Sequence, residues 1–75
     1  MDYLVTVSYE DKDDVVHTIE RGAWTAEDGI HFIYEELEPI MTDWPSINPY
    51  GVLVNASVES DDGDFCDTYE FKLGM

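Results

Sequence analysis

Positive charge is scarce in this chain. Its 75 residues contain three Lys and Arg against 18 Asp and Glu, which gives a formal net charge of −15. The three cations, Lys12, Arg21 and Lys72, are scattered along the sequence, so they are poorly suited to neutralise a row of nucleic-acid phosphates. The same scarcity argues against direct binding to an anionic membrane. We therefore expect a cationic partner.

Cysteine and long apolar runs are scarce as well. The single cysteine, Cys66, allows no internal disulfide, which excludes a disulfide-stapled miniprotein. No apolar run approaches the roughly 20 residues of a membrane-spanning helix. The Met-Asp start lacks the basic segment of a signal peptide. These features favour a cytoplasmic protein, and the length predicts a single domain over residues 1–75.

The chain is nevertheless rich in apolar residues, with 44% hydrophobic and 13% aromatic content. Acidic disordered chains lack aromatic and β-branched residues, so this composition predicts a folded domain. A core of this size supplies only about 3–5 kcal/mol of net stability. The free-energy cost of repulsion among the acids must therefore be smaller than this net stability.

The N-terminal third predicts a β-hairpin. Residues 2–9 alternate between apolar and polar positions, and residues 15–20 form the second strand after a polar loop at 10–14. This places His17 on the apolar face, where we expect it to be buried and hydrogen-bonded. The predicted pairs are Val5 with Ile19, Val7 with His17, and Tyr9 with Val15.

A helix is predicted to follow. Thr25 is a suitable N-cap, with Asp28 three residues further on. Pro39 should end the helix near Glu38, because its ring clashes with the carbonyl four residues earlier. Residues 42–51 contain two prolines and a glycine, which predicts a loop. The apolar stripe of the helix is predicted to contain Ala26, Ile30, Ile33, Tyr34 and Leu37.

A second hairpin completes the fold. Residues 52–59 alternate again, and Asp62-Gly63 indicates a two-residue turn that places Asp61 opposite Asp64. The order ββαββ predicts an α+β fold, in which one helix packs on one face of a four-stranded antiparallel sheet. The predicted pairs of this hairpin are Val52 with Leu73, Val54 with Phe71, and Ala56 with Tyr69.

The acids gather in three places: two hairpin connections and one stripe of the helix. Like charges opposed across a hairpin are destabilising, and such conflicts are expected at functional sites. Two plainer interpretations stay open: Asp and Gly are common turn residues, and excess acid is also typical of salt-adapted proteins. The candidate partner-binding residues are Glu10, Asp11, Asp13, Asp14, Glu27, Asp28, Glu35, Glu38, Glu59, Asp61, Asp62 and Asp64.

In size, acidity and lack of catalytic groups, the chain resembles the small inhibitors of phages and mobile elements that mimic double-stranded DNA. These include anti-CRISPR and anti-restriction proteins. The resemblance covers the whole chain in character and implies a stoichiometric, non-enzymatic inhibitor. We expect it to be a monomer rather than a dimer, in the cytoplasm of a bacterial host cell. Its partner would be a CRISPR effector, whose DNA channel is lined by Arg and Lys. The alternatives are an anti-restriction protein, an acidic neutraliser of a basic toxin or nuclease, and a salt-adapted interaction domain.

Other candidate chemistry is weaker. His31 lies between Glu27 and Glu35 on the helix. Partial neutralisation of these two carboxylates by the histidine is a simpler interpretation than metal binding. The 61–64 turn does not match the ligand spacing of a calcium-binding EF-hand loop. Cys66 lies among acids without a nearby cation, which disfavours a nucleophilic thiolate. We predict no enzyme activity, no metal and no cofactor.

Several aromatic and apolar residues fall outside the predicted core pattern. Phe32 lies outside the helical stripe, and Trp44 falls in the predicted loop. Together with Ile47 and Tyr50 they are expected to cap the open end of the sheet. The alternative is that they anchor the partner, because Trp and Tyr are enriched at interface hot spots.

Overall fold

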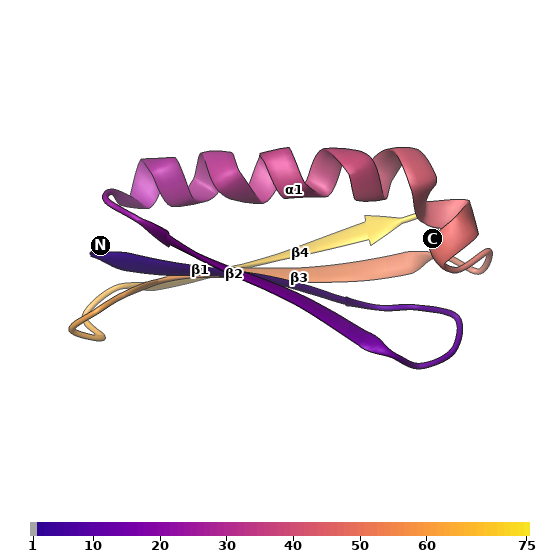
Figure 1. The fold of residues 1–75 in the computed structure, drawn as a ribbon, viewed down its shortest axis with the longest axis horizontal. Coiled ribbons are helices and arrows are strands. Elements are labelled where there is room, and N and C mark those ends of the chain that lie inside the picture. Colours follow the sequence, from indigo (N-terminus) through magenta and orange to yellow (C-terminus); the bar gives the residue numbers. More distant parts are fainter. Residues whose placement is uncertain (1) are drawn as a thin grey trace.

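Four antiparallel strands form one sheet in the order β2-β1-β3-β4, and a single helix covers one of its faces (Figure 1). The computed structural model describes residues 2–75 and confirms the predicted ββαββ order and α+β class. The elements are β1 (Tyr3–Glu10), β2 (Val16–Ala23), α1 (Ala26–Ile47), β3 (Val52–Ser60) and β4 (Cys66–Leu73).

The core lies between α1 and the two central strands. β1 and β3 pair with each other, from Tyr3 opposite Ser60 to Tyr9 opposite Val54. Their helix-facing valines are almost fully buried, whereas no polar or charged residue among residues 2–75 is buried. All of the charge is thus carried outside the core. The buried apolar residues are Val5, Val7, Ala23, Phe32, Ile33, Leu37, Ile40, Val52, Val54, Ala56 and Val58.

The predicted helix end near Glu38 and the predicted loop over residues 42–51 are wrong. Helix α1 continues through Pro39 and Pro45 to Ile47. A proline inside a helix costs about 3 kcal/mol, whereas burying a large apolar side chain gains about 1.5–3 kcal/mol. The added turns bury Ile40 and pack two further side chains, Trp44 and Ile47, against the core. Tertiary burial therefore outweighs the local effect of the prolines.

The helix also turns a different face to the sheet than its apolar stripe predicts. Phe32 is only 5% exposed, whereas Tyr34, expected in the stripe, is 56% exposed. The buried arc includes Gly29, where an added Cβ would lie 3.0 Å from Val5 Cγ2 and 3.1 Å from Val58 Cγ1. Because glycine has no side chain at this point, the helix approaches the sheet closely and the buried arc shifts toward Phe32.

The register of the first hairpin differs from the prediction by two residues. Val5 pairs with Arg21, Val7 with Ile19, and Tyr9 with His17. The loop consists of residues 11–15 rather than 10–14, and the Asp11 N–H donates to the Val15 carbonyl across it at 3.0 Å. Because the shift is even, each residue keeps its predicted face of the sheet.

The register of the second hairpin is confirmed over the whole length of β4. Its connection is longer than predicted, because residues 61–64 link Ser60 to Phe65, which are joined by a backbone hydrogen bond of 2.8 Å. Asp61 and Asp64 therefore lie in the turn and do not face each other within the ladder. Gly63 adopts a φ of 80°, the left-handed conformation that favours glycine.

Candidate partner-binding surface

The molecule is elongated and densely charged along its length. Its Cα atoms extend over 38 × 20 × 17 Å, and its radius of gyration is 12.8 Å, against about 11 Å expected for a domain of this length. Fifteen net negative charges over 38 Å correspond to one per about 2.5 Å. Duplex DNA carries one per ~1.7 Å. The linear charge density is therefore about two thirds that of DNA.

The two hairpin connections lie at opposite ends of the long axis (Figure 1). This follows from the topology, because β3 runs antiparallel to β1 beside it. The structure therefore does not bring the two acidic connections together. The first acidic tip consists of Glu10, Asp11, Asp13 and Asp14. The second acidic tip consists of Glu59, Asp61, Asp62 and Asp64.

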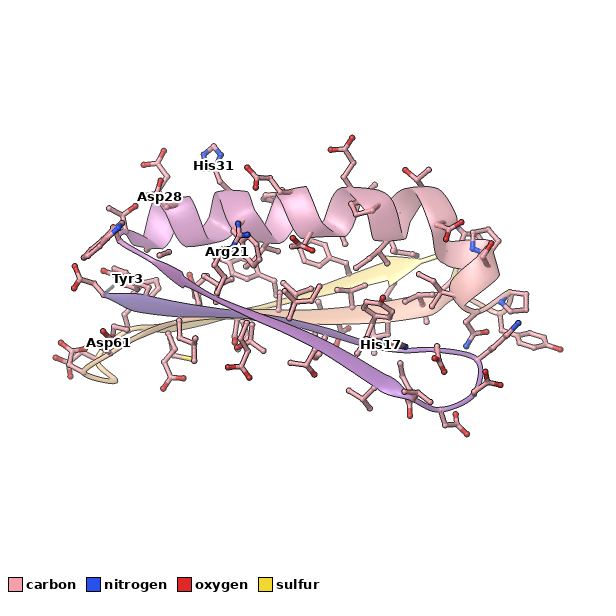
Figure 2. The ribbon with its side chains drawn as sticks, in the orientation of Figure 1. Tyr3, His17, Arg21, Asp28, His31 and Asp61 are labelled. Atoms are coloured by element: carbon pink, nitrogen blue, oxygen red, sulfur yellow. The ribbon has the colours of Figure 1, made fainter. Side chains whose placement is uncertain are left out.

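A third group of acids, the helix stripe, faces away from the sheet. Figure 2 shows Asp28 and His31 pointing outward from α1. The Asp28 N–H donates to the Thr25 hydroxyl oxygen at 3.1 Å, which confirms the predicted N-cap. His31 is also exposed and lies within this stripe. The helix stripe consists of Glu27, Asp28, Glu35 and Glu38, all of them exposed.

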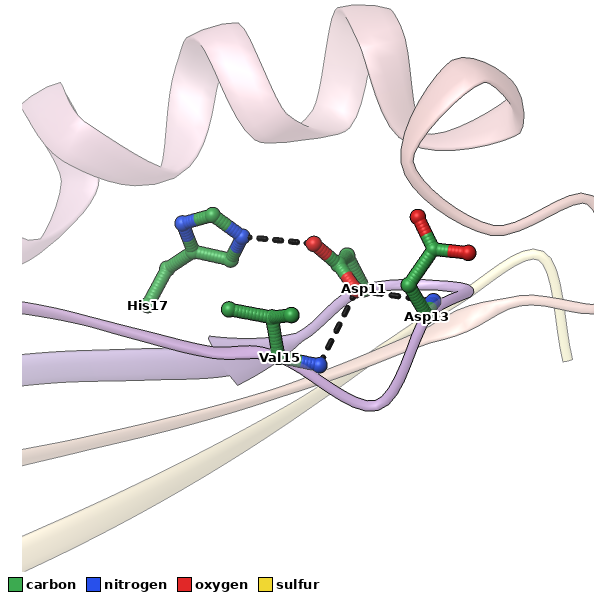
Figure 3. Close-up of polar contacts among 4 residues, drawn as sticks. All are labelled: Asp11, Asp13, Val15 and His17. Atoms are coloured by element: carbon green, nitrogen blue, oxygen red, sulfur yellow. Dashed lines mark hydrogen bonds and ion pairs between the residues drawn. The ribbon is translucent and has the colours of Figure 1, made fainter.

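One carboxylate holds the first acidic tip in place. Asp11 Oδ1 accepts hydrogen bonds from the Asp13 N–H at 2.8 Å and the Val15 N–H at 3.0 Å (Figure 3). Asp11 Oδ2 lies 2.8 Å from His17 Nε2. The hydrogen bond from His17, followed by that from Val15, lowers the pKa of Asp11 below its ordinary value. Asp11 is thus a structural residue, while Asp13 and Asp14 are exposed.

The prediction that His17 is buried is wrong. Its side chain is 44% exposed and stacks on Tyr9, with ring centroids 5.1 Å apart. The shifted register places it on edge strand β2 close to the first tip. There it hydrogen-bonds a loop carboxylate instead of a core group.

The second acidic tip is built in the same way. Asp62 Oδ1 accepts from the Ser60 hydroxyl at 2.7 Å and from the Asp64 N–H at 3.0 Å. These two hydrogen bonds, that from Ser60 first, lower the pKa of Asp62. Asp61 and Asp64 are exposed, and within residues 2–75 their carboxylates take part in no hydrogen bond or ion pair. These two side chains are the ones that the turn presents outward.

Sequence reasoning missed two residues at this end of the molecule. The Asp61 N–H donates to the Asp2 carbonyl at 2.9 Å, and the Asp2 N–H donates to the Ala23 carbonyl at 3.1 Å. Asp2 therefore extends the second tip toward Trp24, which is 70% exposed. A tryptophan in the short connection between two predicted elements was the available sequence signal for an exposed ring.

The four aromatic and apolar residues that fell outside the predicted pattern divide between core and surface. Phe32 is buried, and Trp44 and Ile47 pack against the core. Tyr50 is 90% exposed, so it caps nothing. Only Tyr50 among these four is free to contact a partner.

The cations do little to offset the acids. Between residues 2 and 75, the one Lys or Arg ion pair joins Lys72 Nζ to Glu70 Oε1 at 4.0 Å, at the limit of such a contact. The Arg21 guanidinium carbon instead lies 4.3 Å from the centroid of the Phe32 ring. Further acids, including Glu20 and Asp43, are exposed on other parts of the surface. Exposed carboxylates therefore lie outside the two tips and the helix stripe as well.

One concavity lies at the end of the molecule that carries the first tip. A concavity of about 320 Å³ lies beside the first tip, lined by Glu10, Asp11 and Asp14 together with side chains that include Asn48 and Asn55. Across residues 2–75, no three His, Cys, Asp or Glu side chains are grouped so that they could hold a metal ion. The exposed Cys66 is a free thiol on edge strand β4.

Helix α1 carries several acids along its 22 residues. In the described part of the chain, no helix combines the length and the hydrophobicity that crossing a bilayer requires.

Comparisons of this chain with protein-family models, with curated proteins and with solved structures found no match.

Proposed function

We propose that this protein is a non-enzymatic inhibitor that imitates double-stranded DNA and occupies the DNA-binding or motif-reading site of a CRISPR effector. The observation that supports this most is the linear charge density of an elongated body, one net negative charge per about 2.5 Å over 38 Å. That length matches about 11 base pairs at 3.4 Å per step. It suffices to cover a short recognition motif and the duplex beside it.

The inhibitor would act by exclusion. CRISPR effectors read their short recognition motif with arginines and hold nucleic acid in a positively charged channel. Carboxylates placed in that channel take the place of phosphates, and the opposite fields accelerate encounter. Each exposed ion pair contributes only about 0.2–1 kcal/mol. Many carboxylates must therefore engage together, which requires acids distributed over a large surface.

The scaffold limits the entropic cost of binding. Asp11 and Asp62 hold the two tips through hydrogen bonds to backbone and side-chain donors. The neighbouring carboxylates therefore project from turns that are already ordered in the free protein. Pre-ordering of this kind raises affinity without a new contact, because less freedom is lost on binding.

The test is competition with DNA for purified effector complexes of different CRISPR types. We expect the protein to prevent binding of target duplex by one such complex, with an affinity that falls steeply as salt rises. Neutralisation variants should spare Asp11 and Asp62, so that both turns keep their hydrogen bonds. Suitable sets are Asp13→Asn with Asp14→Asn, Asp61→Asn with Asp64→Asn, and Glu27→Gln with Glu35→Gln and Glu38→Gln.

A control matched in charge to the two tip sets removes two charges elsewhere. Glu20→Gln with Glu70→Gln changes the helix-free face of the sheet, because Glu20 pairs with Thr6 and Glu70 with Asn55 on that face. We expect at least one of the three sets to weaken inhibition tenfold or more, and the control to change it less than twofold. Inhibition that survives neutralisation of all three sets would refute the proposal.

The same assays separate the alternatives. Blocking a restriction enzyme instead of any CRISPR complex indicates an anti-restriction protein. Binding to one basic toxin or nuclease without competition from DNA indicates a neutraliser. A chain that competes with DNA nowhere and unfolds in dilute buffer indicates a salt-adapted domain.

A further inference from the structure

A large aromatic ring stands exposed at the end of the molecule where the second acidic tip and the start of α1 meet. Trp24 lies in the connection between β2 and α1 and is 70% exposed. Figure 2 shows Asp28 and Asp61 at this same end. The hydrogen bonds of Asp2 to Ala23 and to Asp61 tie the connection to the tip. The open indole therefore lies at an acidic end of the molecule, and the two acids that share a concavity with it are Asp28 and Glu35 of α1.

Trp24 also borders a concavity with a mixed lining. The concavity measures about 220 Å³, and its lining includes Arg21, Phe32, Asp28 and Glu35. The face of Phe32 is already occupied, because the Arg21 guanidinium carbon lies 4.3 Å above its ring centroid. Trp24 is the aromatic side chain of this concavity that is left open. Two carboxylates and one guanidinium make the lining negative overall.

We infer that Trp24 anchors the interface by receiving an arginine side chain of the partner. The guanidinium plane would stack on the indole while its N–H groups donate to the Asp28 or Glu35 carboxylate. Arginine suits such a site, because it combines a flat, weakly hydrated cation with a fork of donors that matches a carboxylate. An anionic partner is excluded by the surrounding acids, and a purely apolar one would leave them desolvated without pairs.

The identity of the arginine-bearing partner rests on the proposed function. Proteins that read DNA bases do so most often with arginine, and CRISPR effectors read their recognition motif in this way. A free aromatic ring among carboxylates would capture such an arginine more tightly than a carboxylate alone. Trp24 would thus be the point on the surface where the binding energy is concentrated.

The test uses nona-arginine and nona-lysine peptides as probes, with affinities measured by isothermal titration calorimetry. We expect the native protein to prefer nona-arginine. Trp24→Ala should lower that affinity about three- to tenfold and lower the nona-lysine affinity less, so the preference shrinks. The variant keeps the net charge of −15, so a purely electrostatic attraction would not change. Trp24→Phe should retain part of the preference.

The matched control is Tyr50→Ala. Tyr50 is 90% exposed and follows the C-terminal end of α1, far from Trp24 along the helix. We expect this variant to bind both peptides as the native protein does. An arginine preference that Trp24→Ala leaves unchanged, or that Tyr50→Ala reduces equally, would overturn the inference. Far-UV circular dichroism confirms that each variant is folded.

Failure of the inference and failure of the proposed function give different results. The peptide assay contains no effector. A Trp24-dependent arginine preference in a protein that competes with DNA for no effector supports the anchor and refutes the proposed function. Inhibition of an effector that Trp24→Ala leaves intact refutes the anchor and supports the proposed function.

Discussion

The close approach of helix and sheet at Gly29 offers a sharp test of the packing. At Gly29 an added Cβ would lie 3.0 Å from Val5 Cγ2 and 3.1 Å from Val58 Cγ1. Both valines are fully buried, so neither can move aside into solvent. Gly29→Ala therefore combines two opposite effects. The helix gains about 0.8–1.0 kcal/mol of propensity, and overpacking costs about 1–3 kcal/mol.

We expect Gly29→Ala to destabilise the protein by about 1 kcal/mol, since the steric cost exceeds the gain in propensity. The assay is urea unfolding followed by far-UV circular dichroism at 25 °C, with a check that the slope of the transition is unchanged. The control is Ser46→Ala, an exposed position of the same helix. There alanine replaces an exposed serine and adds no atom, so no new contact forms and stability should rise by a few tenths of a kcal/mol.

A second variant shows whether the contact itself is responsible. Val58→Ala removes both methyl groups that face Gly29. The contact with Val5 Cγ2 remains in that background, so Gly29→Ala should destabilise less than in the native protein, which gives a coupling of about 0.5–1 kcal/mol. If Gly29→Ala alone stabilises the native protein by the full propensity gain, or if Val58→Ala leaves its effect unchanged, the packing argument is wrong.

Three further predictions concern the helix, the turns and the charge. Pro39→Ala should stabilise the protein by about 1–2 kcal/mol, because exposed Pro39 interrupts a helix that continues beyond it; a lower midpoint of urea unfolding than in the native protein would contradict this. Asp62→Ala should be less stable than Asp64→Ala at pH 6, although both remove one charge, because only Asp62 accepts turn hydrogen bonds through its side chain. Since folding lowers the pKa of Asp62 below its ordinary 3.8, that stabilisation is present above pH 3.8 and is lost as the pH falls through the lower, folded value; thermal melts at pH 6 and pH 2.5 test whether the gap closes. Raising NaCl from 10 mM to 0.5 M should raise the melting temperature by about 5–10 °C, because the Debye length falls from about 30 Å to a few Å and repulsion among the acids is screened. An unchanged melting temperature would show that this repulsion takes little from the free energy of unfolding.

The features that depend on near neighbours in sequence could be predicted well. Alternation with period two gave the positions of β1 and β3, and Thr25 marked the helix start. The tight connection at 61–64 set the register of β3 and β4. The net charge, and with it the expectation of a cationic partner, needs only a count of residues.

The candidate surface could be predicted in part. The sequence identified which acids cluster, because neighbours in a turn stay neighbours in the fold. It could not show that Asp11 and Asp62 hold the turns while Asp61 and Asp64 face outward, since this depends on the direction of each side chain. It also could not show that Asp2 joins the second tip, which requires a contact across the length of the chain.

By itself, the sequence determined the class of fold, the order of the elements and the strength of the negative field, because local pattern and composition are sufficient for these. Only the tertiary structure decided where α1 ends, since the burial of Ile40 outweighs the effect of Pro39. It likewise decided that the two acidic tips lie at opposite ends of the molecule, since the pairing of β1 with β3 joins segments about 50 residues apart. Long-range burial and strand pairing are collective, so no local pattern contains them.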